Sequence, residues 1–115
     1  MGCDIHAYIE YEAPGEDWIT CFCSLHLDRN YSLFAALAGV RGGFPKIPPR
    51  GIPKNTSLEV ADELAFWNKD AHSHSWLSPW ELMDVTRDVH SIQIDALLNT
   101  MRFFPNSRLV FWFDN

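Results

Sequence analysis

The feature that most restricts the fold of this chain is the closing segment from Arg108 to Phe113, which follows the turn residues Pro105 and Asn106. The segment is almost continuously apolar and rich in aromatic side chains. A short apolar run that follows a turn is typical of a strand inside a sheet, because an edge strand usually alternates polar and apolar residues. We therefore expect a closing strand at the centre of a sheet.

The amino-terminal part of the chain predicts further strands. Residues 1–11 alternate, so that Cys3 and Ile5 share one face while Asp4 and His6 share the other. A turn-forming segment over residues 12–17 follows, and the β-branched and aromatic segment from Trp18 to Cys23 predicts an antiparallel return strand. A further strand or extended segment is expected over residues 70–77.

The middle of the chain predicts helices, each with a recognisable start or stop. We expect them at 31–38 before Gly39, at 57–67 with Ser57 as cap, from Ser78 with Pro79 and Glu81 in the first turn, and at 88–101. Residues 40–56 hold four of the seven prolines and are expected to form a long irregular loop. The pattern predicts a single α+β domain over residues 1–115, with a mostly antiparallel sheet of three to four strands and helices packed on one face.

Composition excludes some functions. The chain has 115 residues and a formal net charge of −6, and this acidic balance argues against duplex DNA as a partner. No apolar run reaches the length of a membrane span. The three cysteines are an odd number without a secretory leader, so we expect no disulfide framework and a cytoplasmic location. The sequence does not predict an oligomeric state.

Two short tracts hold side chains that bind metals or move protons: Asp70-Ala71-His72-Ser73-His74 and Asp4-Ile5-His6. In an extended strand, residues two apart lie on the same face. Carboxylates and imidazoles are ligands of divalent metals such as zinc or manganese. We therefore expect a metal site, whose candidate ligands are Asp4, His6, Asp70, His72 and His74.

In that site Asp70 and His74 are also the candidate catalytic residues. The alternative for each tract is a solvated face or a polar loop with hydrogen-bonded histidines. Asp114, which follows the apolar run, lies at a strand end from which its carboxylate can also reach a site.

A second group of residues is cationic and aromatic, and we expect it to bind a ligand. Guanidinium groups bind phosphates through two parallel hydrogen bonds, and aromatic rings stack on bases. The alternative is that the arginines form ordinary surface ion pairs with some of the 15 Asp and Glu residues. The candidate ligand-binding residues are Arg29, Tyr31, Arg41, Arg50 and Trp76.

Several motifs taken together resemble a family of small uncharacterised proteins encoded by bacteriophages and prophages. The motifs are Met1-Gly2-Cys3-Asp4-Ile5-His6, Arg29-Asn30-Tyr31 with Leu33-Phe34-Ala35 and Leu37-Ala38-Gly39-Val40-Arg41-Gly42, Pro49-Arg50-Gly51 with Pro53, Asp70 to Leu77, and Val110 to Asn115. The resemblance covers nearly the whole chain. It implies a phage accessory protein in the host cytoplasm, and it implies no mechanism.

Two functions remain open from the sequence. The first is a divalent-metal-dependent hydrolase that acts on a phosphate-bearing small molecule or nucleotide, with the histidine tracts holding the metal and Arg41 and Arg50 holding the substrate. The second is a non-catalytic binding protein, which sequesters a nucleotide-like ligand or inhibits a host defence protein.

Overall fold

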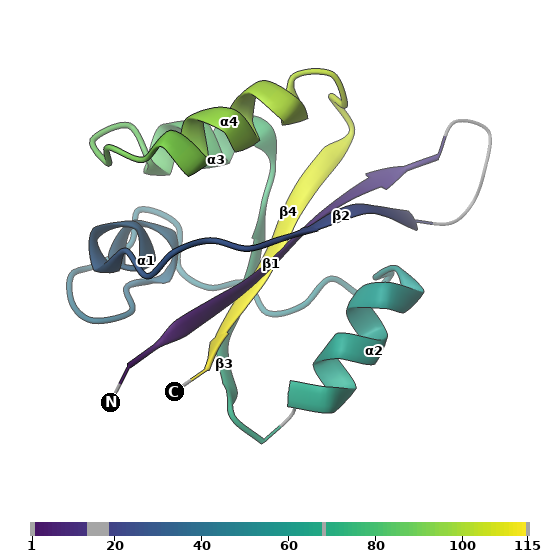
Figure 1. Cartoon of the computed structure of the whole chain (residues 1–115), viewed down its shortest axis with the longest axis horizontal. Coiled ribbons are helices and arrows are strands. Elements are labelled where there is room, and N and C mark those ends of the chain that lie inside the picture. Colours follow the sequence, from purple (N-terminus) through teal and green to yellow (C-terminus); the bar gives the residue numbers. More distant parts are fainter. Residues whose placement is uncertain (1, 14–18, 68, 115) are drawn as a thin grey trace.

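The computed structural model describes residues 2–13, 19–67 and 69–114, which form one four-stranded antiparallel sheet and four helices (Figure 1). The predicted α+β class is therefore confirmed. The sheet has the strand order β2-β1-β4-β3. Its elements are β1 (Asp4–Glu12), β2 (Ile19–Leu25), α1 (Tyr31–Ala38), α2 (Leu58–Trp67), β3 (Ala71–Leu77), α3 (Pro79–Val85), α4 (Ile92–Met101) and β4 (Ser107–Asp114).

Strand β4 lies in the middle of the sheet, as its apolar sequence predicts. It pairs with β1 along one side and with β3 along the other. The β1–β4 register places Asp4 opposite Asp114 and Glu10 opposite Arg108. This pairing brings the first and last described strands of the chain side by side, so that both chain ends lie at the same end of the sheet (Figure 1).

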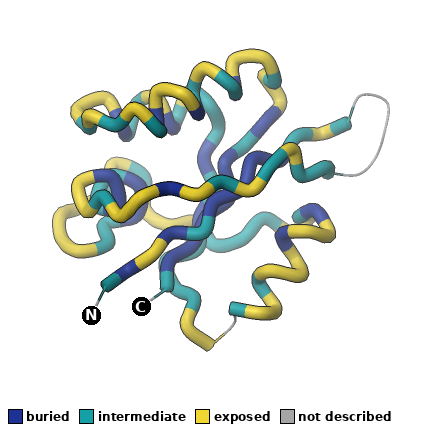
Figure 2. Tube along the Cα trace, viewed as in Figure 1, coloured by how far each residue is buried: buried dark blue, intermediate teal, exposed yellow. Residues whose placement is uncertain are grey.

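Each face of the sheet carries its own apolar core. Phe111 and Phe113 of β4 belong to the larger core, which α1, α3 and α4 cover. Val110 and Trp112 point to the other face and pack with Val60 of α2. The expectation that the helices lie on one face holds for three of them, whereas α2 covers the opposite face (Figures 1 and 2). Because β4 presents large apolar side chains alternately to both faces, both faces need cover.

The helix ends follow the capping residues in the sequence. Asn30 accepts a hydrogen bond from the Leu33 N–H, and α1 ends at Gly39, whose φ of 74° suits glycine. Ser78 and Glu81 form the expected capping box of α3. Helix α4 begins at Ile92 rather than at 88, because Ser91 caps it. The predicted loop over 40–56 contains no helix or strand, and residues 14–17 of the predicted turn at 12–17 lie outside the described residues.

Both outer strands contain a β-bulge. In β3, His72 pairs with Phe113 and Ser75 pairs with Phe111, so two residues of β3 lie opposite one residue of β4. In β2, Cys23 pairs with Ile9 and Cys21 pairs with the next residue, Glu10, so β2 also has one extra residue at this point. A bulge adds one residue to a strand and changes the face on which the following side chains lie. Spacing two along these strands therefore does not keep two side chains on one face.

A buried ion pair joins the two central strands to the start of α2. Glu10 is fully buried and accepts hydrogen bonds from the guanidinium of Arg108, at 2.8 and 3.0 Å. The second carboxylate oxygen of Glu10 accepts from the backbone N–H of Ser57 at 2.7 Å, and Arg108 also donates to Asn55. These bonds hold the end of the long loop and the start of α2 against the sheet.

We predict that Glu10→Ala lowers the free energy of unfolding by about 3 kcal/mol, because it leaves the charge of Arg108 without its carboxylate partner in a largely buried position. Urea denaturation followed by circular dichroism measures the loss. Lys46→Ala is the control, because Lys46 pairs with Asp84 on an exposed surface, and such a pair contributes less than about 1 kcal/mol. Equal small losses in the two variants contradict the structural role of Glu10.

Candidate functional site

The bulge in β3 separates the two histidines that the sequence groups together. His72 pairs with Phe113, and their rings stack with centroids 6.2 Å apart on the face of the larger core. His74 stacks on Trp112, whose side chain belongs to the opposite core. Ser73, which lies between the two histidines, has a positive φ of 56° at the bulge. The expectation that His72 and His74 share one face is therefore wrong, because the strand is bulged between them.

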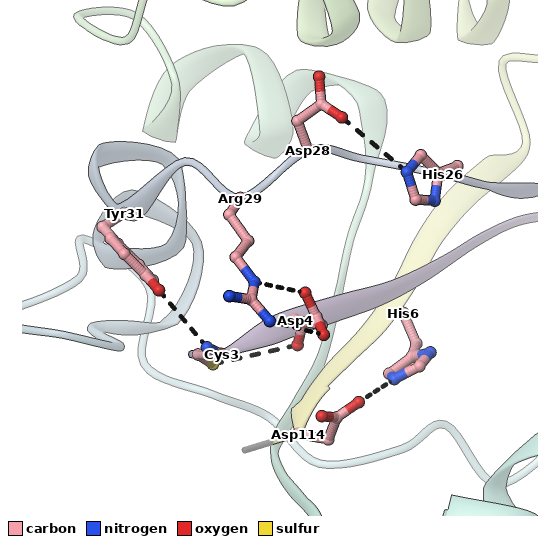
Figure 3. Close-up of polar contacts among 8 residues, drawn as sticks. All are labelled: Cys3, Asp4, His6, His26, Asp28, Arg29, Tyr31 and Asp114. Carbon is pink, nitrogen blue, oxygen red and sulfur yellow. Dashed lines mark hydrogen bonds and ion pairs between the residues drawn. The ribbon is translucent and has the colours of Figure 1, made fainter. Parts of the chain in front are cut away.

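The Asp4 and His6 tract keeps its regular alternation, but its two side chains have different partners. Asp4 accepts two hydrogen bonds from the guanidinium of Arg29, at 2.7 and 3.2 Å. This contact holds the pKa of the Asp4 carboxyl below its ordinary value. His6 instead bonds through Nε2 to the carboxylate of Asp114 (Figure 3). Asp114 is thus the strand-end carboxylate that reaches the site.

Aromatic rings surround the His6–Asp114 pair. The His6 ring lies 4.4 Å from the ring of Trp67 at the end of α2 and 5.8 Å from the ring of Trp112. Trp112 also stacks on Tyr8, with centroids 5.3 Å apart. The side chains of His6 and Asp114 are only 18% and 17% exposed. The pair therefore sits in a partly dehydrated environment, where hydrogen bonds to charged groups are stronger than in water.

A cleft of about 470 Å³ opens beside this pair, between the ends of β1 and β2 and the end of α2. We call it the His6 cleft. Its described lining combines polar groups with one aromatic wall and includes no lysine or arginine. The lining residues are Asp4, Ile5, His6, Tyr8, Ser24, Leu25, His26, Leu27, Trp67 and Asp114.

Across the described residues, no group of three or more His, Cys, Asp or Glu side chains is placed to hold a metal ion. Asp70 lies exposed in the turn before β3, and its backbone N–H bonds to Trp67. No hydrogen bond or ion pair joins Asp70 to His74 within the part of the chain that the structure describes. The five predicted metal ligands therefore do not converge on one point.

The predicted ligand-binding residues form two separate groups. Arg41 lies over the ring of Tyr31, with its guanidinium carbon 5.0 Å from the ring centroid. Tyr31 is also close to the amino-terminal strand, because its hydroxyl oxygen lies 3.5 Å from the backbone nitrogen of Cys3 (Figure 3). Arg29 belongs to the same region through Asp4.

The second group lies at the other outer strand. Arg50 lies over the ring of Trp76, at 4.4 Å, and forms a two-bond ion pair with Glu81. This ion pair holds the pKa of Glu81 at about 2. Arg29 and Arg50 therefore form ion pairs with carboxylates of the protein, as the alternative interpretation expects. None of the predicted ligand-binding residues lines the His6 cleft.

The three cysteines are free, in agreement with the expectation of no disulfide framework. Cys3 is buried in the larger core, and Cys23 packs against the same core. Cys21 packs against the smaller core on the other face. Burial raises the pKa of all three thiols, that of Cys21 to about 11. A raised thiol pKa disfavours the reactive thiolate, so these cysteines have a packing role.

Two residues of the site were not predicted from the sequence. Trp67 is the last residue of α2, and the apolar stripe of that helix does not reveal that its end reaches His6. Tyr8 continues the Asp4 and His6 alternation, which is the one signal that places it on the same face. Burial together with the nearby Glu63 raises the pKa of Tyr8 to about 12, so its hydroxyl stays protonated.

Comparison of the chain with protein-family models, with curated proteins and with solved structures gives no match. The resemblance to phage and prophage proteins therefore stays a prediction. Within the described ranges, none of the helices has the length and apolar character needed to cross a bilayer.

We predict that the stability of the protein depends on the protonation of His74. Burial lowers the pKa of this imidazole below its ordinary 6.5, and the neighbouring His72 adds to the shift. Above pH 6.5 both the folded and the unfolded states hold a neutral His74. As the pH falls from 6.5 towards the lower folded pKa, the unfolded state binds the proton first and the free energy of unfolding decreases.

The His74→Gln variant lacks this loss, so its stability relative to the wild type improves as the pH falls from 7.5 to 5. Chemical denaturation at a series of pH values measures the difference between the two proteins. A difference that does not change with pH contradicts the partly buried, neutral state of His74.

We also predict that zinc or manganese does not stabilise the protein, because the described histidines and carboxylates do not converge. The measurement compares the melting temperature of EDTA-dialysed protein before and after addition of each metal. The His72→Ala/His74→Ala double variant serves as control for adventitious binding. A rise in the wild type that the double variant lacks shows that the two histidines bind metal, and it contradicts this prediction.

Proposed function

We propose that this protein is a non-catalytic binding protein that holds a small, flat, hydrogen-bonding ligand in the His6 cleft. The observation that carries the proposal is the cleft itself, in which the His6–Asp114 pair stands beside the ring of Trp67. Its volume of about 470 Å³ suits a small molecule. Small-molecule sites typically combine an aromatic wall with a few fixed polar groups.

The His6–Asp114 pair supports recognition through hydrogen bonds. Because Nε2 of His6 faces the Asp114 carboxylate, that contact fixes the orientation of the ring and leaves Nδ1 for a ligand atom. The ring also packs against Trp67 and Trp112, which limits its rotation. A group that is already held in position loses little conformational entropy when a ligand binds.

A metal-dependent hydrolase has less support than a binding protein. Catalytic metal sites need about three protein ligands around one open position. The described residues offer no such group. The arginines proposed to hold a phosphate lie outside the cleft, and Arg50 is occupied by Glu81.

The charge of the cleft favours a ligand without a phosphate. Asp4 and Asp114 place two carboxylates on its wall, and the Arg29 guanidinium that bonds to Asp4 is occupied by that carboxylate and does not itself line the cleft. A planar nitrogen heterocycle can stack on Trp67 and bond to His6 without meeting this repulsion. We therefore propose a nucleoside-like ligand rather than the phosphate-bearing one expected from the sequence.

We predict that adenosine binds in the cleft and that AMP binds more weakly, because the AMP phosphate meets the two carboxylates. Titration of ¹⁵N-labelled protein followed by NMR measures both affinities and shows which residues shift. Replacement Trp67→Ala removes the stacking surface and weakens adenosine binding by about tenfold, since a stacked base contributes about 1–3 kcal/mol.

Trp80→Ala is the matched control, because Trp80 is also a tryptophan, is 77% exposed and does not line the cleft. Equal affinities in the two variants contradict the proposed site. Chromatography of adenosine after prolonged incubation with the protein tests the absence of catalysis. Conversion of adenosine to another compound contradicts a purely binding role.

A further inference from the structure

An apolar groove runs between α3 and α4 on the outer side of these helices, away from the His6 cleft. It has a volume of about 330 Å³. Trp80 and Met83 of α3 face Leu98 and Met101 of α4 across it, and two prolines form part of its walls. The groove and the His6 cleft have no lining residue in common.

Some of the apolar side chains that line the groove are exposed to solvent. Trp80 is 77% exposed and Met83 is 44% exposed, although both are large apolar side chains. Phe103, which directly follows the groove residue Arg102 in the chain, is 79% exposed. Clustered exposed apolar residues of this size mark interaction surfaces more often than isolated ones do. Tryptophan contributes strongly to binding energy, and methionine adapts to different partners.

A positive charge without a described ionic partner stands at the rim of the groove. Arg102 lines the groove and forms no ion pair with any residue that the structure describes. Arg29, Arg50, Arg87 and Arg108 each bind a carboxylate of the protein. At the groove, Arg102 therefore offers a local positive charge to which an acidic group of a partner is complementary.

We propose that the groove between α3 and α4 binds an amphipathic helix of another protein, whose apolar side chains contact Trp80 and Met83 and whose acidic residue pairs with Arg102. A helix fits because its residues at i, i+3 and i+4 form a continuous apolar stripe, which matches a groove between two helices. Phe103, a further exposed aromatic residue, directly follows the groove residue Arg102 in the chain. This inference does not rest on the ligand of the His6 cleft.

The test uses the full chain and a labelled helical peptide of leucine and glutamate, with leucines at helical spacing and glutamates on one flank. A second peptide has lysine in place of glutamate. Fluorescence anisotropy measures both dissociation constants. We expect the glutamate peptide to bind more tightly than the lysine peptide, and Trp80→Ala to weaken its binding at least about tenfold, as anchor residues at interfaces do.

The charge-swap variant Arg102→Glu reverses the preference, so that it binds the lysine peptide more tightly than the glutamate peptide. Two matched controls leave both affinities unchanged: Phe66→Ala, an exposed aromatic residue elsewhere, and Lys54→Glu, the same charge change elsewhere. NMR shifts of the bound protein locate the peptide at α3 and α4. The proposal is overturned if no binding is detected, if the preference is unchanged in Arg102→Glu, or if Phe66→Ala weakens binding as much as Trp80→Ala.

Discussion

The antiparallel pairing of β1 with β4 is the constraint on which the rest of the molecule depends. It joins residues that are 108 positions apart in the chain, His6 and Asp114, and it places the closing strand between two neighbours. Because β4 is central, its side chains build both cores, and the helices distribute over both faces to cover them. The same pairing aligns Glu10 with Arg108, whose ion pair anchors the start of α2. The position of Trp67 at the far end of α2 follows from that anchor.

The bulges in the outer strands explain the main difference between sequence and structure. Alternation predicted β1 correctly, because that strand is regular where His6 and Tyr8 share a face. The same rule failed in β3, where one extra residue sends His72 and His74 to opposite faces. The sequence carries little warning of this bulge, since Ser73 is not the glycine that a positive φ usually favours.

Local signals predicted local structure well. Caps and breakers set the bounds of α1 and α3, and Ser91 set a later start for α4 than the apolar pattern suggested. The fold class and the central position of β4 followed from patterns of polarity. The sequence did not predict which carboxylate each arginine contacts, because such pairs depend on contacts between distant elements. Arg29 with Asp4 and Arg50 with Glu81 are examples.

The site is therefore organised around His6 and Asp114 rather than around the histidine tract of β3. A double-mutant cycle with His6→Ala, Asp114→Ala and the double variant tests this claim most directly, with the free energy of unfolding as the readout. The structure predicts a coupling of at least about 0.5 kcal/mol, because contacting residues are non-additive. Additive losses within about 0.3 kcal/mol would show that the two side chains do not interact, and would contradict the account.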